Sequence, residues 1–103
     1  MGLAARKQTY PYITTNPRIA GGAPIVKGTR VSVRIIAGYY QMGMSVDEIL
    51  NTLQHLTASQ IHSALAYYFD HQREIEKDMK EAADTEYWKK QVLLHPKQTA
   101  SAR

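Results

Sequence analysis

Two helix-start signals, twelve residues apart, constrain what this chain can fold into more than any other feature of its sequence. At the first, Ser45 can accept a hydrogen bond from the backbone N–H of Glu48, whose side chain can reach back to the N–H of Ser45. At the second, Thr57 and Gln60 repeat this spacing. Apolar residues flank both capping boxes as hydrophobic staples: Met44 and Ile49, then Leu56 and Ile61. Two helices joined this closely predict a helix-turn-helix, a common way of placing a helix in the DNA major groove.

Apolar residues at helical spacing predict a three-helix bundle over residues 32–70. We expect Ser32 to cap the first helix and Gly43 to end it in the left-handed conformation. The second helix is expected from Val46 to about Leu53, and the third after Thr57. The expected core is Val33, Ile36, Ala37 and Tyr40 from the first helix, Ile49, Leu50 and Leu53 from the second, and Ile61, Ala64, Leu65 and Tyr68 from the third.

The segment before the bundle favours short strands. Residues 1–9 are expected to be a disordered arm, and residues 10–31 a short β segment. Strand-forming residues occur at 10–15, around Ile25 and Val26, and around Arg30 and Val31. An exposed edge of such a sheet can be completed by a second copy of the chain, so we expect a homodimer.

Residues 71–103 are expected to form a helical extension and a tail. The sequence gives the third helix no stop at Tyr68, and an apolar stripe continues through Ile75, Met79 and Ala82. Thr85 is expected to interrupt this helix and cap a last piece that ends near Leu94. That piece carries an apolar cluster: Tyr87, Trp88, Val92, Leu93 and Leu94. The cluster could pack on its own domain or in the groove of a partner protein, and the charged stretch before it favours the partner.

Charge and composition narrow the functional classes. The net charge is +4, but residues 1–46 contain six Lys or Arg and no Asp or Glu. Such a cationic segment suits the phosphates of a nucleic acid. The chain has no cysteine, and its four histidines are scattered, so we expect no metal site and no cofactor. No group of residues forms a catalytic constellation, so we expect no enzyme. With no secretory signal and no membrane span in the sequence, a cytoplasmic protein is expected.

Candidate DNA contacts lie in the cationic segment and at the start of the third helix: Arg18, Lys27, Arg30, Arg34, Thr57, Ser59, Gln60, His62 and Ser63. The exposed side of this helix is expected to carry Ala58, Ser59, His62, Ser63 and Tyr67, and small polar groups there can reach base edges or phosphates. The helix has no Lys or Arg before Arg73, which is weak for recognition of guanine. A compact helical core with a partner-binding surface is therefore the alternative.

Several motifs, taken together, resemble the small bacterial family called domain of unknown function 433. They are Arg18 to Gly22 with Pro24, Lys27 to Val31, Gly43 to Ser45, Glu48 to Leu50, His55 to Thr57 and Ala64 to Tyr67, within about residues 12–70. The resemblance implies short β segments before a homeodomain-like three-helix bundle. It also implies similarity to VapB-type antitoxins, which bind a toxin with a PIN-type ribonuclease fold and repress their own operon. The family supplies no catalytic residues, and this chain has Ser32 where the family often has Pro.

We therefore expect a mainly α fold, with short N-terminal β segments, a homeodomain-like three-helix bundle and an extended C-terminal helix. The expected function is that of a helix-turn-helix DNA-binding protein, the antitoxin and autorepressor of a toxin–antitoxin operon. Its expected partners are promoter DNA, a PIN-type ribonuclease toxin and a second copy of the chain. The alternative is a protein-interaction module that does not bind DNA and docks a partner through its C-terminal helix.

Overall fold

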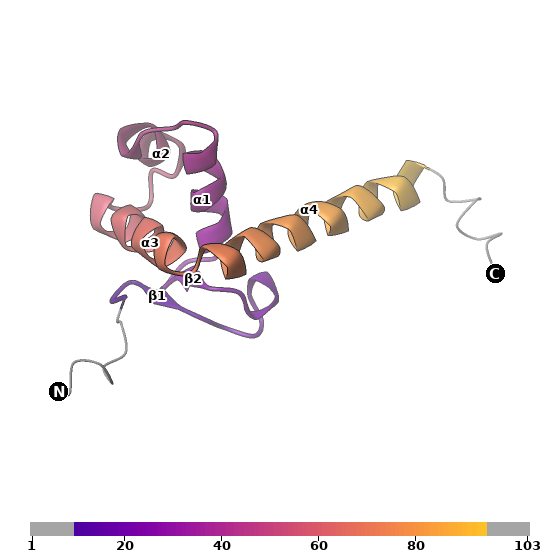
Figure 1. The fold of residues 1–103 in the computed structure, drawn as a ribbon, viewed down its shortest axis with the longest axis horizontal. Coiled ribbons are helices and arrows are strands. Elements are labelled where there is room, and N and C mark those ends of the chain that lie inside the picture. Colours follow the sequence, from indigo (N-terminus) through magenta and orange to yellow (C-terminus); the bar gives the residue numbers. More distant parts are fainter. Residues whose placement is uncertain (1–9, 95–103) are drawn as a thin grey trace.

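The computed structural model describes residues 10–94, so the arm expected over residues 1–9 lies outside the described part. A short two-stranded sheet precedes the helices, as expected, and the fold is mainly α (Figure 1). The elements in chain order are β1 (Ile13–Thr14), the short 3-10 helix η2 (Ala20–Gly22), β2 (Ile25–Val26), α1 (Val33–Gln41), α2 (Val46–Thr52), α3 (Ala58–Asp70) and α4 (Gln72–Leu94).

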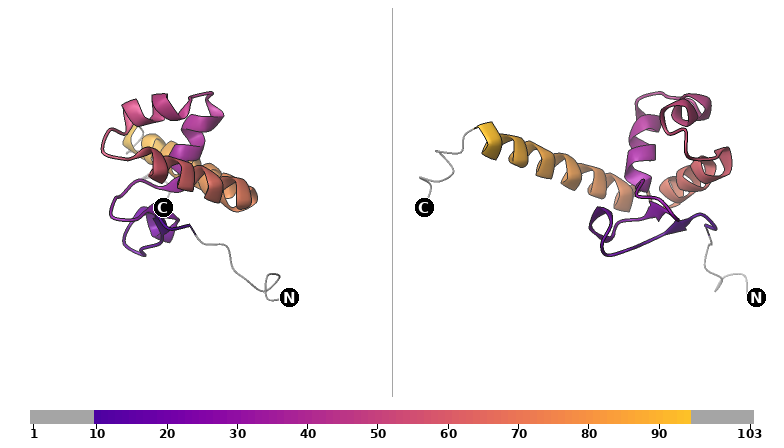
Figure 2. Two further views of the ribbon diagram at one scale, coloured as in Figure 1. Left: turned by 90° about the vertical axis from the view of Figure 1, so that its left-hand side faces the viewer. Right: turned by 180° about the vertical axis from the view of Figure 1, so that it is seen from behind.

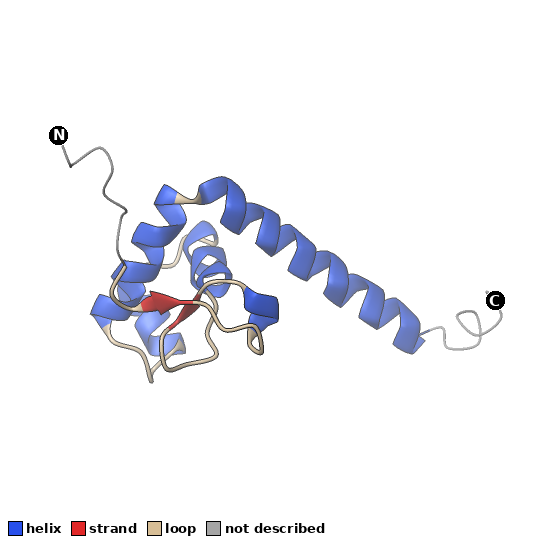
Figure 3. Ribbon diagram, turned by 90° about the horizontal axis from the view of Figure 1, so that it is seen from below, coloured by secondary structure: helices blue, strands red, loops and turns tan. Residues whose placement is uncertain are grey.

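The sheet is antiparallel and small, and Figure 3 shows it in front of the helices when the molecule is seen from below. Ile13 pairs with Val26, and Thr14 pairs with Ile25. A tight turn follows β2, in which the amide of Thr29 donates to the carbonyl of Val26 at 3.0 Å. The strand expected around Arg30 and Val31 does not form. Only a single bridge joins Ile25 to Ser32, because Ser32 already begins α1.

Both capping boxes form as the sequence predicts. The Ser45 amide donates to Glu48 Oε1 at 2.8 Å, and the Glu48 amide donates to Ser45 Oγ at 3.2 Å. The corresponding distances between Thr57 and Gln60 are 2.8 Å and 3.2 Å. Each box satisfies amides that the first turn would otherwise leave without partners. Gly43 has φ +90°, the left-handed conformation expected after α1.

The core is built from the apolar faces of α1, α2 and α3. Of the residues expected to be buried, Val33, Ile36, Ala37, Ile49, Ile61, Ala64, Leu65 and Tyr68 are, and Leu50 and Leu53 pack against them half-buried. Tyr40 was expected in the core, but 43% of its surface is exposed. It lies at the outer edge of the bundle, where its ring meets the edge of Phe69 at 5.2 Å.

Ser32 occupies the N-cap position of α1, as expected, but its side chain makes no capping bond. Its hydroxyl is buried and has no hydrogen-bond partner among residues 10–94. The cap is therefore only positional, and the hydroxyl contributes nothing to the helix start.

The third helix stops at His71, contrary to the expectation that it would continue. His71 has φ −134° and ψ 41°, which are not helical, and α4 starts one residue later. The His71 ring stacks on Tyr67 with centroids 4.1 Å apart, and its Nδ1 lies 3.0 Å from the carbonyl oxygen of Tyr67. The break redirects α4 across α1, where Ile75 is fully buried and Met79 partly buried. The expected stripe of Ile75, Met79 and Ala82 is confirmed as the inner side of α4.

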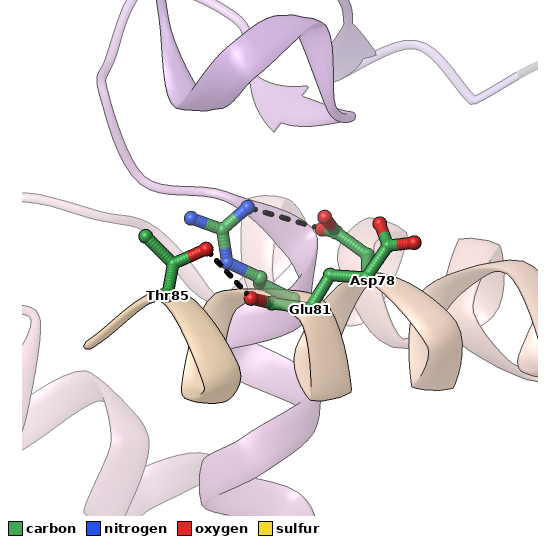
Figure 4. A network of polar contacts seen from close by, with 4 residues as sticks. Asp78, Glu81 and Thr85 are labelled. Atoms are coloured by element: carbon green, nitrogen blue, oxygen red, sulfur yellow. Dashed lines mark hydrogen bonds and ion pairs between the residues drawn. The ribbon is translucent and has the colours of Figure 1, made fainter. Parts of the chain in front are cut away.

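The expected interruption at Thr85 is wrong, because α4 is continuous through it. Thr85 Oγ1 donates back to the carbonyl of Glu81 at 2.9 Å, so the side chain joins the helix instead of capping a new one (Figure 4). Beyond this point α4 extends away from the bundle, as the views in Figure 2 show, and the longest dimension of the molecule is 61 Å. Within residues 10–94, no helix combines the length and apolar character needed to cross a bilayer.

Candidate nucleic-acid interface

The link between α2 and α3 leaves the start of α3 open to solvent. Ser59 and His62 are exposed, as expected for side chains that would face the DNA major groove. Thr57 is also exposed, but its hydroxyl oxygen accepts from Gln60, and Gln60 Oε1 accepts from Thr57. These two oxygens hold the helix start in place. The first turn contains no acidic residue, so its amide end keeps a partial positive charge that favours an anion.

Two residues expected on the exposed side of α3 are half-buried. Ser63 is turned partly inward, and Tyr67 is covered by aromatic rings. Tyr10 meets Tyr67 edge-on at 5.0 Å, and His71 stacks on it at 4.1 Å. Burial raises the pKa of Tyr67, and the neighbouring carboxylate of Glu74 adds to this. The accessible side of α3 is therefore narrower than the sequence predicts, and Ser59 and His62 are its polar members.

Tyr10 fastens the N-terminal segment to the end of α3. Its hydroxyl donates to Asp70 Oδ2 at 2.5 Å, and this bond raises the pKa of Tyr10 to about 12, with help from desolvation and the Asp70 charge. The contact fixes the side of the bundle on which residues 10–31 lie. The segment that carries Arg18, Lys27 and Arg30 is therefore attached to the helical bundle through Tyr10.

The four candidate cations, three in this segment and Arg34 in α1, do not share one environment. Arg18, Lys27 and Arg30 are exposed. Arg34 instead forms an ion pair with Asp78 of α4, with Nη1 and Oδ2 3.1 Å apart (Figure 4). Both side chains are mostly covered, with 22% and 24% of their surfaces exposed. Arg34 therefore fastens α1 to α4, and its charge is already compensated.

An open hollow of about 690 Å³ lies between the N-terminal segment and the link that joins α2 to α3. Its walls come from β1 and the loop after it, from β2 and the turn after it, and from the link between α2 and α3. The lining residues are Thr14, Thr15, Asn16, Ile19, Ile25, Gly28, Thr29, Arg30 and His55. Arg30 and His55 thus line one site although they are 25 residues apart. His55 was not among the predicted site residues. Its position two residues before Thr57, the first residue of the second capping box, is the sequence signal that could have identified it.

The last turns of α4 carry the apolar residues expected to bind a partner. Tyr87, Trp88, Val92 and Leu93 expose 56%, 64%, 47% and 79% of their surfaces, whereas the side chain of Leu94 lies outside the described part. The first four therefore do not pack on their own domain within residues 10–94. The favoured alternative, docking in the groove of a partner protein, stays a prediction.

Comparison with known proteins gives three matches. The family model described as a protein of unknown function, DUF433, matches residues 13–68. A curated relative, the uncharacterized protein y4eO of Sinorhizobium fredii, is 40% identical over 55 residues, which are 53% of this chain and 25% of that protein. The chain therefore spans about a quarter of that relative. A crystal structure of a DUF433 member from Anabaena variabilis matches with a TM-score of 0.63 and 28% identity, over 67% of this chain and 68% of that one.

Proposed function

This chain belongs to the DUF433 family, whose description names no activity, and from its own residues we propose that it is a small helix-turn-helix DNA-binding protein. The observation that supports this most is the placement of Arg30 beside the link between α2 and α3. Arg30 lines the same hollow as His55, which lies three residues before α3 begins, and α3 is the helix that would enter the major groove.

The charge distribution supports the same proposal. Residues 10–46 contain four cations and no Asp or Glu, and three of the cations are exposed: Arg18, Lys27 and Arg30. In this proposal they contact phosphates and position the protein, while Ser59 and His62 reach base edges from the start of α3. We leave Arg34 out of the interface because Asp78 compensates its charge. Thr57 and Gln60 position α3 through its capping box. We leave Ser63 out of the interface because it is half-buried.

The test is the salt dependence of binding to the promoter of its own gene. Three phosphate contacts per chain predict that log Kobs falls with log salt concentration at a slope of about −2.7 per chain. Arg30→Ala should make this slope shallower by about 0.9. Lys80→Ala removes an equally exposed cation from α4 and is the matched control. Absence of binding at low salt, or an equal change of the salt slope in Arg30→Ala and Lys80→Ala, would contradict the proposal.

The role in the cell that we propose is that of an antitoxin and autorepressor, acting as a homodimer in the cytoplasm. This role depends on the family resemblance and requires a neighbouring gene for a PIN-type ribonuclease. Co-expression of the two products should give a complex that binds the promoter more tightly than this chain alone. A neighbouring gene of another kind, or the absence of a complex, would contradict the antitoxin role. The proposal of DNA binding would remain.

The exposed end of α4 favours a second candidate function, a protein-interaction module. Large apolar side chains exposed together are typical of binding sites. Trp88→Ser and Leu93→Ser should abolish the complex with the neighbouring gene product, while Ala83→Ser, on the same helix, should not. Because all three positions are solvent-exposed or nearly so, the circular dichroism spectrum should be unchanged in each. A complex that still forms with both substitutions would exclude this surface as the binding site of the partner.

A further inference from the structure

We propose that the open hollow between the N-terminal segment and the α2–α3 link binds a phosphate group. The hollow is open to solvent, and its walls come from two parts of the chain that are distant in sequence. None of its lining residues is Asp or Glu. Its charged groups are therefore the guanidinium of Arg30 and, when protonated, the imidazole of His55.

The donors that remain available in the hollow fit an anion with several oxygens. The Arg30 guanidinium presents a planar fork that matches two phosphate oxygens. The hydroxyls of Thr14 and Thr15 can donate to others. The Asn16 carbonyl oxygen already accepts from the Arg18 amide at 2.9 Å, so its NH₂ group is the part left to donate. The Thr29 hydroxyl is committed to the turn, because it donates to the Val26 carbonyl at 2.8 Å.

The shape of the hollow indicates more than inorganic phosphate. Ile19 and Ile25 form an apolar part of the wall, which suits the sugar or base attached to a phosphate. Two sources supply this chemistry: a phosphate of the DNA backbone and a free nucleoside monophosphate. In the first case the inference rests on the proposed DNA binding and specifies one of its contacts. In the second case it stands without DNA binding.

A phosphate in the hollow would bridge two elements that the fold holds side by side. Arg30 follows β2, and His55 belongs to the link that sets where α3 begins. Occupation of the hollow therefore fixes the link against the sheet. The link is short, so this contact acts directly on the start of α3.

The experiment follows the ring signals of His55 and the amide signals of Thr14 and Thr15 by NMR, in the full chain. One arm titrates adenosine 5′-monophosphate, and the other titrates the promoter duplex. We expect saturable shifts of these signals with at least one probe. Arg30→Ala should weaken the response about tenfold or more, since a charge-assisted hydrogen bond is lost. His55→Ala should weaken it by a smaller factor, and Arg73→Ala, an exposed cation outside the hollow, should leave it unchanged.

The outcomes separate this proposal from the proposed function. Shifts with the nucleotide and no binding of the duplex would support the hollow and overturn the DNA-binding function. Duplex binding with shifts confined to α3, together with no shift on addition of the nucleotide, would keep that function and overturn the hollow. No shift of these signals with either probe, or shifts that persist in Arg30→Ala, would overturn the proposal.

Discussion

Replacing Ser32 with alanine should stabilise the protein, although serine is a favoured residue at a helix start. The Ser32 hydroxyl is 1% exposed and has no hydrogen-bond partner within residues 10–94. A buried hydroxyl without a partner costs about 1–3 kcal/mol. Its removal leaves a void of one oxygen atom, and this void destabilises the folded state by about 0.5 kcal/mol at most. We therefore expect Ser32→Ala to raise the free energy of unfolding by about 1 kcal/mol.

Proline at the same position should stabilise further. Ser32 has φ −83°, close to the value that proline imposes. The bridge between Ile25 and Ser32 uses the amides of Val26 and Val33, which donate at 2.8 Å and 2.9 Å, and so does not need the Ser32 amide. Ser32→Pro removes the hydroxyl and also restricts the unfolded chain, which adds about 0.4–1 kcal/mol.

Urea unfolding followed by circular dichroism at 222 nm measures both effects. One kcal/mol corresponds to a rise in Tm of about 4–8 °C in a domain of this size. Ser59→Ala, at an exposed helical serine, is the matched control and should change stability by less than about 0.5 kcal/mol. A loss of stability in Ser32→Ala at an unchanged m value would refute the reasoning, because it would mean that the hydroxyl has a partner such as a buried water.

Four further predictions follow from contacts elsewhere in the fold. Ile75→Ala should cost about 2–5 kcal/mol in urea unfolding, because Ile75 is fully buried where α4 meets the core; a loss under 1 kcal/mol would show that α4 is not docked there. Thr57→Ala removes the cap of α3 and should cost about 1 kcal/mol, whereas no loss would mean that the box is not formed in solution. Asp78→Ala should lower Tm because it leaves Arg34 half-buried without its partner, and an unchanged Tm would mean that the pair contributes nothing. The raised pKa of Tyr10 means that its neutral form is stabilised in the folded state. This contribution to the free energy of unfolding is complete below pH 10 and is lost as the pH rises towards about 12. Tyr10→Phe should remove that part of the pH dependence, and a stability profile identical to that of the unchanged protein would contradict the prediction.

Local signals in the sequence predicted the helical part of the fold well. A capping box needs only residues three apart, so Ser45 and Thr57 could mark their helices without knowledge of the tertiary structure. The apolar faces of the three bundle helices have the same local origin. The family resemblance, found over about residues 12–70, is confirmed by the family match over residues 13–68.

Features that depend on contacts between distant residues could not be predicted in this way. The stop at His71 involves packing against Tyr67 and Tyr10, which lies 61 residues earlier. The ion pair of Arg34 joins residues 44 apart, so no local pattern distinguished Arg34 from the exposed Arg30. Thr85 had a plausible capping pattern, but the same hydroxyl can bond within a helix, and the surrounding helix formers determined the outcome.

The separation of the two candidate surfaces has a consequence for assembly. The start of α3 and the apolar end of α4 lie toward opposite ends of a molecule whose longest dimension is 61 Å (Figure 1). A duplex at one end and a protein at the other would not collide, so neither ligand needs to leave before the other arrives. The two proposed ligands are therefore expected to bind at the same time, in a ternary complex in which α4 separates them.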